Sequence, residues 1–270
     1  MSNTDAIPVA KGHAYGNDFL LVPEAAAGAD RPGLARALCH RHHGIGADGL
    51  IVYGRPALGA TMDLYNADGS PSELSGNGLR CLAALVAREQ GLAPGASVAV
   101  DTGAGPKTLE LLAREGVRYT FRAALGPPGG IRQMTLEAAG EAVAATVLSM
   151  GNPQCVVLGP LPDEARFHRL GAALAVHAAF PSGTNVEFVS VESPDRVRIL
   201  IWERGVGPTT ASGTGAAASA VAAAAHGGAD RSVDVESPGG TQHVDWRDDG
   251  VHLTGWADLV LDGRWLPSPR

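Results

Sequence analysis

Ser75-Gly76-Asn77-Gly78 decides how the chain is organised, because its pattern occurs a second time as Ser212-Gly213-Thr214-Gly215. Each copy comes directly before an alanine-rich segment that predicts a helix. A helix N-terminus exposes unpaired backbone N–H groups and partial positive charge, so it suits an anion. Two such termini, one in each half of the chain, can bind a single small carboxylate from opposite sides.

Short runs of apolar and β-branched residues, bounded by turn residues, predict the strands. They are Phe19–Val22, Leu50–Val52, Met62–Tyr65, Ser97–Val100, Thr146–Ser149, Cys155–Leu158, Val186–Val191 and Val197–Trp202. The predicted helices are Gly33–His42, Leu79–Gln90, Glu164–Ala175 and Ala216–Ala225. Both Ser-Gly-x-Gly copies therefore lie where a strand gives way to a helix. The Pro-Pro-Gly-Gly run at Pro127–Gly130 lies near the expected boundary between the halves.

Length and charge limit the class of protein. With 270 residues the chain can bury a sizeable core, as one large domain or two smaller ones. Its formal charge of −7 argues against a nucleic-acid partner, because binding phosphates needs a basic surface. The first residues do not resemble a signal peptide, and the apolar run Gly215–Ala225 is far shorter than the about 20 residues that span a membrane. We expect a soluble, cytoplasmic protein with no membrane partner.

The sequence carries no pattern typical of a cofactor or metal site. Its three cysteines, Cys39, Cys81 and Cys155, form no C-x-x-C pair, so neither a disulfide framework nor a thiolate metal site is implied. No P-loop, zinc-binding helix motif or dinucleotide fingerprint occurs. We therefore expect no cofactor and no metal ion.

Four further segments, together with the two copies, match the motifs of one known protein family. They are Gly12–Phe19, Gly44–Gly49, Met150–Pro153 and Gly183–Phe188. Together, nearly the whole chain resembles diaminopimelate epimerase, a cofactor-independent isomerase that inverts an amino-acid α-carbon. The resemblance implies an α/β (α+β) fold of two similar domains, each a barrel-like curved sheet around a central helix, with the site in the interdomain cleft. The domains would be residues 1–122, to which residues 256–270 return, and residues 123–255.

The same resemblance implies the site residues. Ser75 and Ser212 fall where the family has its two catalytic cysteines, and Glu203 matches a glutamate that supports catalysis. The substrate-binding set of the family matches Asn17, Asn66, Gly76, Asn77, Asn152, Asn185, Arg204, Gly213 and Thr214. Arg204 would bind a distal carboxylate through two parallel hydrogen bonds. Amides offer both donors and an acceptor, so they can serve a carboxylate and an ammonium group.

The departures from the family lie at its proton-transfer residues. Besides the two serines, Gln154 replaces a histidine, Pro208 a glutamate and Gly49 a glutamine. The changes at Gln154 and Pro208 favour natural divergence over an engineered variant.

Serine poses a problem of acidity that cysteine does not. A thiol ionises near pH 8.5, whereas a hydroxyl should ionise near water's value of roughly 15.7, a gap of about 10 kcal/mol. Two helix dipoles supply at most about 2 kcal/mol each. A catalytic serine therefore needs a partner base, for which Glu203 is the best candidate; His13 and His177 are others.

Three functions remain open. The first is an isomerase that removes and returns a proton at the α-carbon of an amino acid with a distal carboxylate or polar group. The resemblance adds a homodimer and lysine biosynthesis to this function. The second is a lyase, cyclase or single-base isomerase acting through Glu203. The third is an amino-acid-binding protein without turnover. Independently of these, Ser75 and Ser212 suit the N-cap position of a helix.

Overall fold

The computed structural model describes residues 6–56 and 59–267. The chain divides into two compact units, which we call unit 1 (Met1–Ala123 with Gly255–Arg270) and unit 2 (Ala124–Thr254). Strand β17 (Gly250–Trp265) contributes to both, because its first residues pair with β16 (Gly240–Arg247) and its last with β1 (Ile7–Ala14).

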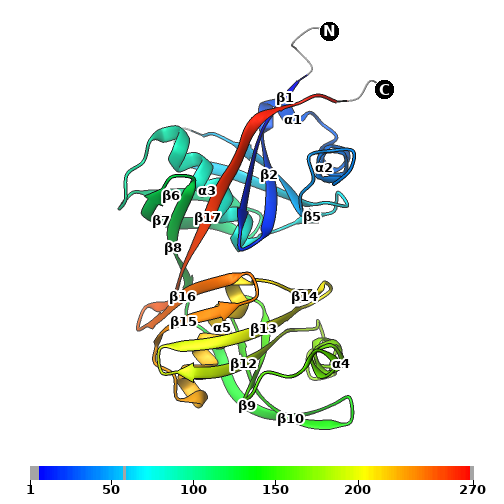
Figure 1. The fold of residues 1–270 in the computed structure, drawn as a ribbon, viewed down its shortest axis with the longest axis vertical. Coiled ribbons are helices and arrows are strands. Elements are labelled where there is room, and N and C mark those ends of the chain that lie inside the picture. The colour runs from blue at the N-terminus through cyan, green and yellow to red at the C-terminus, as the bar shows by residue number, and fades with distance from the viewer. Residues whose placement is uncertain (1–5, 57–58, 268–270) are drawn as a thin grey trace. The chain divides into compact units, whose positions relative to one another are not determined.

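Unit 1 is a closed barrel of strands around one helix. Each strand pairs with the next and the last with the first, in the order β1, β2 (Asn17–Pro23), β3 (Gly49–Gly54), β4 (Ala60–Asn66), β6 (Ser97–Thr102), β7 (Gly105–Glu115), β8 (Arg118–Gly126) and β17. The central helix α3 (Gly76–Gln90) contacts strands from β1 to β7, and its residues 77–87 are buried. Helices α1 (Glu24–Ala27) and α2 (Arg31–Cys39) and strand β5 (Pro71–Ser72) complete the unit (Figure 1).

Unit 2 is built in the same way. Its strands pair successively in the order β9 (Gly129–Ala138), β10 (Glu141–Ser149), β11 (Pro153–Leu158), β12 (Asn185–Ser193), β13 (Arg196–Glu203), β15 (Ser232–Ser237), β16 and β17. Its central helix α5 (Gly213–Ala222) continues into a π-helical turn, η1 (Ala223–Gly227), and lies behind β13 and β15 in Figure 1. Helix α4 (Glu164–Ala175) and strand β14 (Gly207–Thr209) are its remaining elements.

The two units repeat one topology. In unit 1, β2 pairs in parallel with β3, β3 is antiparallel to β4, and β4 pairs with β5 and in parallel with β6. In unit 2, the strands β11, β12, β13, β14 and β15 repeat these pairings in the same order and direction. This geometry brings the start of the first strand, the start of the second and the end of the third to one edge of the sheet.

The predicted fold class is confirmed: the structure is α+β, with a barrel-like sheet around a central helix in each unit. Every predicted strand occurs, extended at one or both ends. The predictions for three helices need correction. Helix α3 begins at Gly76 rather than Leu79 and α5 at Gly213 rather than Ala216, because each follows its serine cap directly. Helix α2 begins at Arg31 because Asp30 caps it, accepting a hydrogen bond from Gly33 N at 2.8 Å, and it ends at Cys39 rather than His42. Helix α5 ends at Ala222, where the π-helical turn begins.

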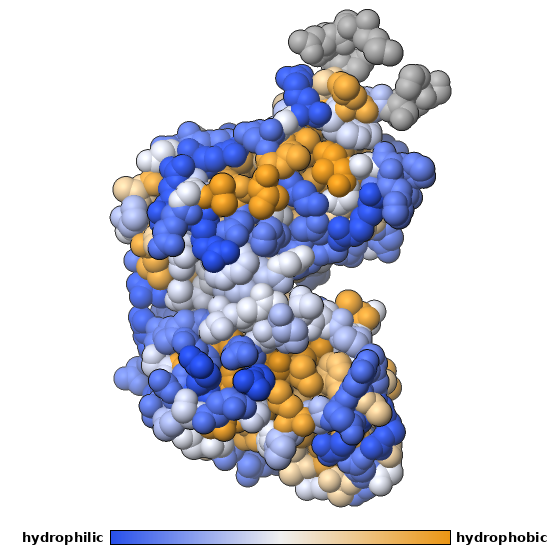
Figure 2. Space-filling model, viewed as in Figure 1, coloured by the Kyte–Doolittle hydropathy of each residue, from blue (hydrophilic) through white to orange (hydrophobic). Residues whose placement is uncertain are grey.

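The sequence did not predict the strands that lie in long hairpins, among them β1, β7, β8, β9 and β15 to β17. In β7, exposed and half-buried polar residues alternate with few buried ones, so its sequence lacks a continuous apolar run. Figure 2 shows one face of the molecule coloured by hydropathy; most of this surface is hydrophilic, and the apolar residues form separate groups on it. In the part of the chain that the structure describes, no helix is long and apolar enough to cross a membrane.

Candidate active site

Ser75 and Ser212 hold equivalent places in the two units, as N-caps of the central helices. The Ser75 hydroxyl accepts a hydrogen bond from Gly78 N at 3.1 Å, and the Ser212 hydroxyl accepts one from Gly215 N at 3.3 Å. Both serines have extended backbone angles, as N-caps usually do. The N-cap interpretation is therefore confirmed. It does not exclude a second role, because a hydroxyl that accepts one hydrogen bond can still donate another.

In unit 1, a chain of amides links the first turn of α3 to the edge of the sheet. The Arg80 guanidinium donates to Asn77 Oδ1, Asn77 Nδ2 donates to Asn17 Oδ1 at 3.2 Å, and Asn17 Nδ2 donates to Asp48 Oδ2 at 2.9 Å. Each amide is held in one orientation by the next. The structure thus brings together two of the predicted substrate-binding residues, Asn17 and Asn77, beside the Ser75 cap.

The carboxylates behind this chain are held by cations. Lys11 Nζ lies 2.8 Å from Asp18, and Arg41 donates to both Asp18 and Asp48. Burial alone would raise the pKa of Asp18, but hydrogen bonds from Lys11 and Arg41 outweigh it, so this pKa lies below its ordinary value. Asp48 shares the Arg41 guanidinium with Asp18 and accepts the hydrogen bond from Asn17.

Asn66, a further predicted substrate-binding residue, lies at the end of β4, opposite Gly49 at the start of β3. Its side chain donates to Ser70 Oγ at 2.9 Å, and its exposed position leaves the amide accessible. Gly76, at the first position of α3, has open space where a Cβ would lie, so a ligand can approach the backbone there.

In unit 2, the Ser212 cap has a carboxylate partner. Glu203 lies at the end of β13 and forms a side-chain hydrogen bond with Ser212. Burial raises the pKa of Glu203 above its ordinary value, and the hydrogen bond from Ser212 opposes this rise. The pair has the arrangement of a nucleophile or acid–base hydroxyl with its base. Among the residues of unit 1 that the structure describes, Ser75 has no such carboxylate as a hydrogen-bond partner.

Asn185 and Arg204 lie next to this pair. Asn185 Oδ1 accepts a hydrogen bond from the backbone N–H of Arg204 at 2.9 Å, which ties the start of β12 to the end of β13. The Arg204 guanidinium is exposed, and one of its nitrogens donates to the Ser182 carbonyl at 2.8 Å. This contact steadies the guanidinium and leaves its other donors for a ligand.

Asn152 connects the remaining unit 2 residues. Its Oδ1 accepts from Gln154 Nε2 at 2.7 Å, and its Nδ2 lies 3.5 Å from Thr214 Oγ1 in the first turn of α5. Gln154, which replaces a family histidine, is fully buried and so orients Asn152 without adding a titratable group. Gly213, next to Thr214, would meet only Leu253 if it carried a Cβ.

The two histidines considered as alternative bases, His13 and His177, make their contacts with residues other than Ser75 and Ser212. His13 Nε2 is 3.9 Å from Asp258, and its ring packs edge-on against Trp256. His177 Nδ1 accepts a hydrogen bond from Ala179 N at 3.1 Å and so closes a turn after α4. Neither is hydrogen-bonded to a cap serine among the described residues, so Glu203 remains the base best placed for one.

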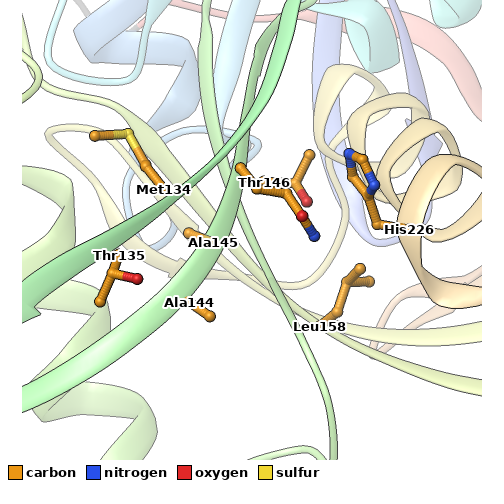
Figure 3. A pocket seen from close by; sticks show the side chains of 8 residues that line it. Met134, Thr135, Ala144, Ala145, Thr146, Leu158 and His226 are labelled. Carbon is orange, nitrogen blue, oxygen red and sulfur yellow. The ribbon is translucent and has the colours of Figure 1, made fainter.

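A hollow of about 400 Å³ in unit 2 lies elsewhere. Figure 3 shows Met134, Thr146, Leu158 and His226 around it, from β9, β10, β11 and η1. None of the predicted site residues lines it, so it offers no support for the site. Among the described residues, no group of three or more His, Cys, Asp and Glu side chains could hold a metal ion.

Three charged residues near the predicted set were missed as site residues: Asp48, Arg80 and Glu187. Asp48 and Glu187 lie inside motifs that carried the family resemblance, and Arg80 follows one of them. The available signal for Glu187 was its position between the apolar residues Val186 and Phe188. Its significance depends on which face of the strand it occupies, and the structure provides that information.

Comparisons with known proteins identify the family of the chain. A model of the family described as diaminopimelate epimerase matches residues 9–127 and 146–260. The diaminopimelate epimerase of Desulforudis audaxviator is 43 % identical over 275 residues, covering 95 % of this chain and 98 % of the relative. That of Moorella thermoacetica is 40 % identical over 272 residues, covering 94 % of this chain and 97 % of the relative.

Solved structures show the fold as well. A predicted epimerase from Pseudomonas aeruginosa superposes with a TM-score of 0.74 at 16 % identity, covering 97 % of this chain and 100 % of that one. A hydroxyproline epimerase from Agrobacterium vitis, with bound trans-4-hydroxy-L-proline, gives 0.70 at 15 % identity, covering 100 % and 95 %. The chain therefore belongs to the diaminopimelate epimerase family, and it is an isomerase.

Proposed function

We propose that this isomerase interconverts stereoisomers of diaminopimelate, or of a closely similar diamino diacid, without a cofactor. The observation that carries the proposal is the hydrogen bond between Ser212 and Glu203 at the N-terminus of α5. It supplies the base that a serine needs where the family has cysteine. The names of the relatives at 43 % and 40 % identity support the substrate class and favour isomerisation over a lyase or a binding protein.

The proton transfers follow from this pair. Ser212 Oγ takes the α-proton while its own proton passes to the Glu203 carboxylate, so the Cα–H bond breaks and its electron pair stays on carbon. Ser75 then donates its hydroxyl proton to the opposite face of the carbanion, and solvent returns a proton to Ser75 and takes one from Glu203. One C–H bond is broken and one is formed with inverted configuration, with no net gain or loss of protons. In the reverse direction Ser75 removes the α-proton while a solvent water accepts its hydroxyl proton, and Ser212 donates to the other face.

Two groups of contacts would hold the substrate. Backbone N–H groups at Gly76, Asn77, Gly213 and Thr214 suit the α-carboxylate, because the first turn of a helix leaves such groups without intrahelical partners. Arg204 suits the distal carboxylate through its free donors. The proposal requires the half-sites of unit 1 and unit 2 to act on one substrate molecule.

We also propose that the chain works as a cytoplasmic homodimer in lysine biosynthesis. We place the self-association on and after β17, where Val260, Leu261 and Leu266 are exposed apolar residues that an interface would bury. Light scattering of the purified protein tests the dimer, with a monomeric mass as the contradicting result. Rescue of a bacterial strain that lacks diaminopimelate epimerase tests the pathway.

The direct test of the activity is stereochemical. Purified protein is incubated with L,L-diaminopimelate, and the meso isomer is measured by chiral chromatography, with Ser212→Ala and Glu203→Gln as comparison variants. We expect conversion by the native protein and a loss of at least about tenfold in each variant, in the range of removing a general acid–base group. Binding without conversion, or a product with a lost leaving group or a closed ring, would contradict the proposal.

A further inference from the structure

Glu187 is a buried carboxyl group that the proposed reaction does not use. Glu187 is fully buried within β12. Within the described residues, neither of its carboxyl oxygens has a hydrogen-bond partner. Buried polar groups are nearly always paired, so such a group calls for an explanation.

The carboxyl group points towards the cap of α5. Glu187 and Val189 are two residues apart on β12, so their side chains lie on the same face of the strand. Val189 packs in the core around α5, whereas Phe188, on the opposite face, packs in the core around α4. A Cβ added at Gly215 would lie 2.8 Å from Glu187 Oε1. Gly215 is the residue whose N–H donates to Ser212. Glu187 therefore lies directly behind the cap serine.

Glu187 and Glu203 form a pair of carboxyl groups in different environments. They lie diagonally on neighbouring strands, because Glu187 is opposite Ile201 in the β12–β13 ladder. Glu203 is half-buried and has a hydrogen bond from Ser212, whereas Glu187 is fully buried and has none. Two neighbouring carboxylates in an apolar setting do not both ionise easily, and the proton stays with the one that is worse solvated.

The residues that face Glu187 from the neighbouring elements include one other carboxyl group, that of Glu203. Gln154 and Val156 face it from β11, Ile201 and Glu203 from β13, and Ser212 and Gly215 from α5. A further titratable group, Cys155, interacts with Glu187 electrostatically and belongs to the opposite face of β11. Burial raises the pKa of the Cys155 thiol to about 12, so it stays neutral.

We propose that Glu187 is a positioning residue that acts through Glu203: it retains the one proton of the carboxyl pair, so that Glu203 keeps its negative charge against the Ser212 hydroxyl. The catalytic meaning of this role rests on the proposed function. Burial, and secondly the charge of Glu203, raise the pKa of Glu187 well above its ordinary value, in agreement with the geometry. At alkaline pH, ionisation of Glu187 would place a second negative charge at the end of α5 where the substrate carboxylate should bind.

The location of the proton can be measured without turnover. Protein labelled with ¹³C at the glutamate carboxyl carbons is titrated by NMR, and the Glu187 and Glu203 signals are assigned by their loss in Glu187→Gln and Glu203→Gln. We expect Glu187 to titrate at higher pH than Glu203, and to shift to lower pH in Glu203→Gln, where the like charge is gone. Glu192→Gln, at an exposed position on the same strand, should leave both midpoints in place. Titration of Glu187 at or below the pH of Glu203, or no shift in Glu203→Gln, would overturn the proposal.

Kinetics supply a second readout that a purely structural role would not change. KM for diaminopimelate should rise at alkaline pH in the native protein, and this rise should disappear in Glu187→Gln, which carries no titrating carboxyl at that position. An identical alkaline rise in KM in both proteins would count against the role. If no isomerisation occurs at any pH, the proposed function fails by itself, and the NMR titration still decides where the proton lies.

Discussion

The hydroxyl groups of Ser75 and Ser212 share a structural position and differ in their neighbours. Both cap a central helix, a role that the sequence predicted from the residue type and its place before a helix. Within the described part of each unit, Ser212 has a carboxylate partner and Ser75 has none, because β13 ends at Glu203 beside the Ser212 cap. The two serines should therefore be unequal in chemistry although they are equal in structure.

Removing either cap should cost a similar amount of stability. We expect Ser75→Ala and Ser212→Ala each to lower the free energy of unfolding by about 1 kcal/mol, because each leaves a first-turn N–H without its acceptor. Urea unfolding followed by circular dichroism measures this, with Ser97→Ala at an exposed strand position as the control. An unchanged midpoint in both cap variants would show that the caps contribute nothing.

Arg204 should discriminate between ligands by their distal group. Arg204→Lys keeps the positive charge but loses the planar fork, so it should weaken binding of meso-diaminopimelate by about tenfold while lysine, which lacks the distal carboxylate, is affected much less. Titration calorimetry with both ligands provides the comparison. Equal affinity of the variant and the native protein for diaminopimelate would show that Arg204 does not bind that carboxylate.

The cysteines should be inert. Cys39, Cys81 and Cys155 are buried, and burial raises the pKa of each thiol to about 12. Because the thiolate is the reactive form, iodoacetamide at pH 8 should neither label them quickly nor inactivate the isomerase. Mass spectrometry of the treated protein checks this. Rapid labelling that substrate prevents would mean that one of the three lies at the site.

Among the elements, those with strong local signals were predictable. Helix α4 was predicted to its last residue, since Asp163 caps it and its apolar residues follow a helical period. The hairpin β7–β8 and the strand β9 were not, because most of their residues are exposed or half-buried and their sequences lack a continuous apolar run.

One ion pair between such elements has a testable pH dependence. Arg118 on β8 donates from Nε and Nη2 to the two carboxylate oxygens of Asp258 on β17, both at 2.8 Å. The hydrogen bond from Arg118 is the main cause that holds the pKa of Asp258 below its ordinary value. The stabilisation should thus be present above the unfolded pKa of about 3.9 and be lost as the pH falls through the lower, folded value.

Asp258→Asn should therefore destabilise the protein at pH 7, by about 1 kcal/mol or less because the Arg118 side chain is 44 % exposed. The difference in Tm between this variant and the native protein should shrink as the pH falls below about 4. Asp101→Asn, at an exposed position of β6, serves as the control. A difference in Tm that stays constant down to low pH would show that packing, not charge, is responsible.

In the whole molecule, the repeated Ser-Gly-x-Gly motif corresponds to a strand topology that occurs in both units. Asn17 and Asn152 precede or begin equivalent strands, and Asn66 and Glu203 end equivalent strands, so the predicted site residues occupy equivalent positions in the two units. The sequence motifs were sufficient to predict the fold class. Glu187 could not be predicted, because its role depends on the face of β12 on which it lies and on a neighbour that the sheet register selects.

The central claim is that the serine pair exchanges the α-proton with solvent while inverting the carbon. The most direct measurement is incubation of L,L-diaminopimelate with the protein in deuterium oxide, followed by NMR and mass analysis of both isomers at early conversion. We predict one deuterium at the inverted α-carbon of the meso product and almost none in recovered substrate, because each face of the carbon is served by its own hydroxyl. Bound diaminopimelate with no deuterium in either isomer after prolonged incubation would contradict the account.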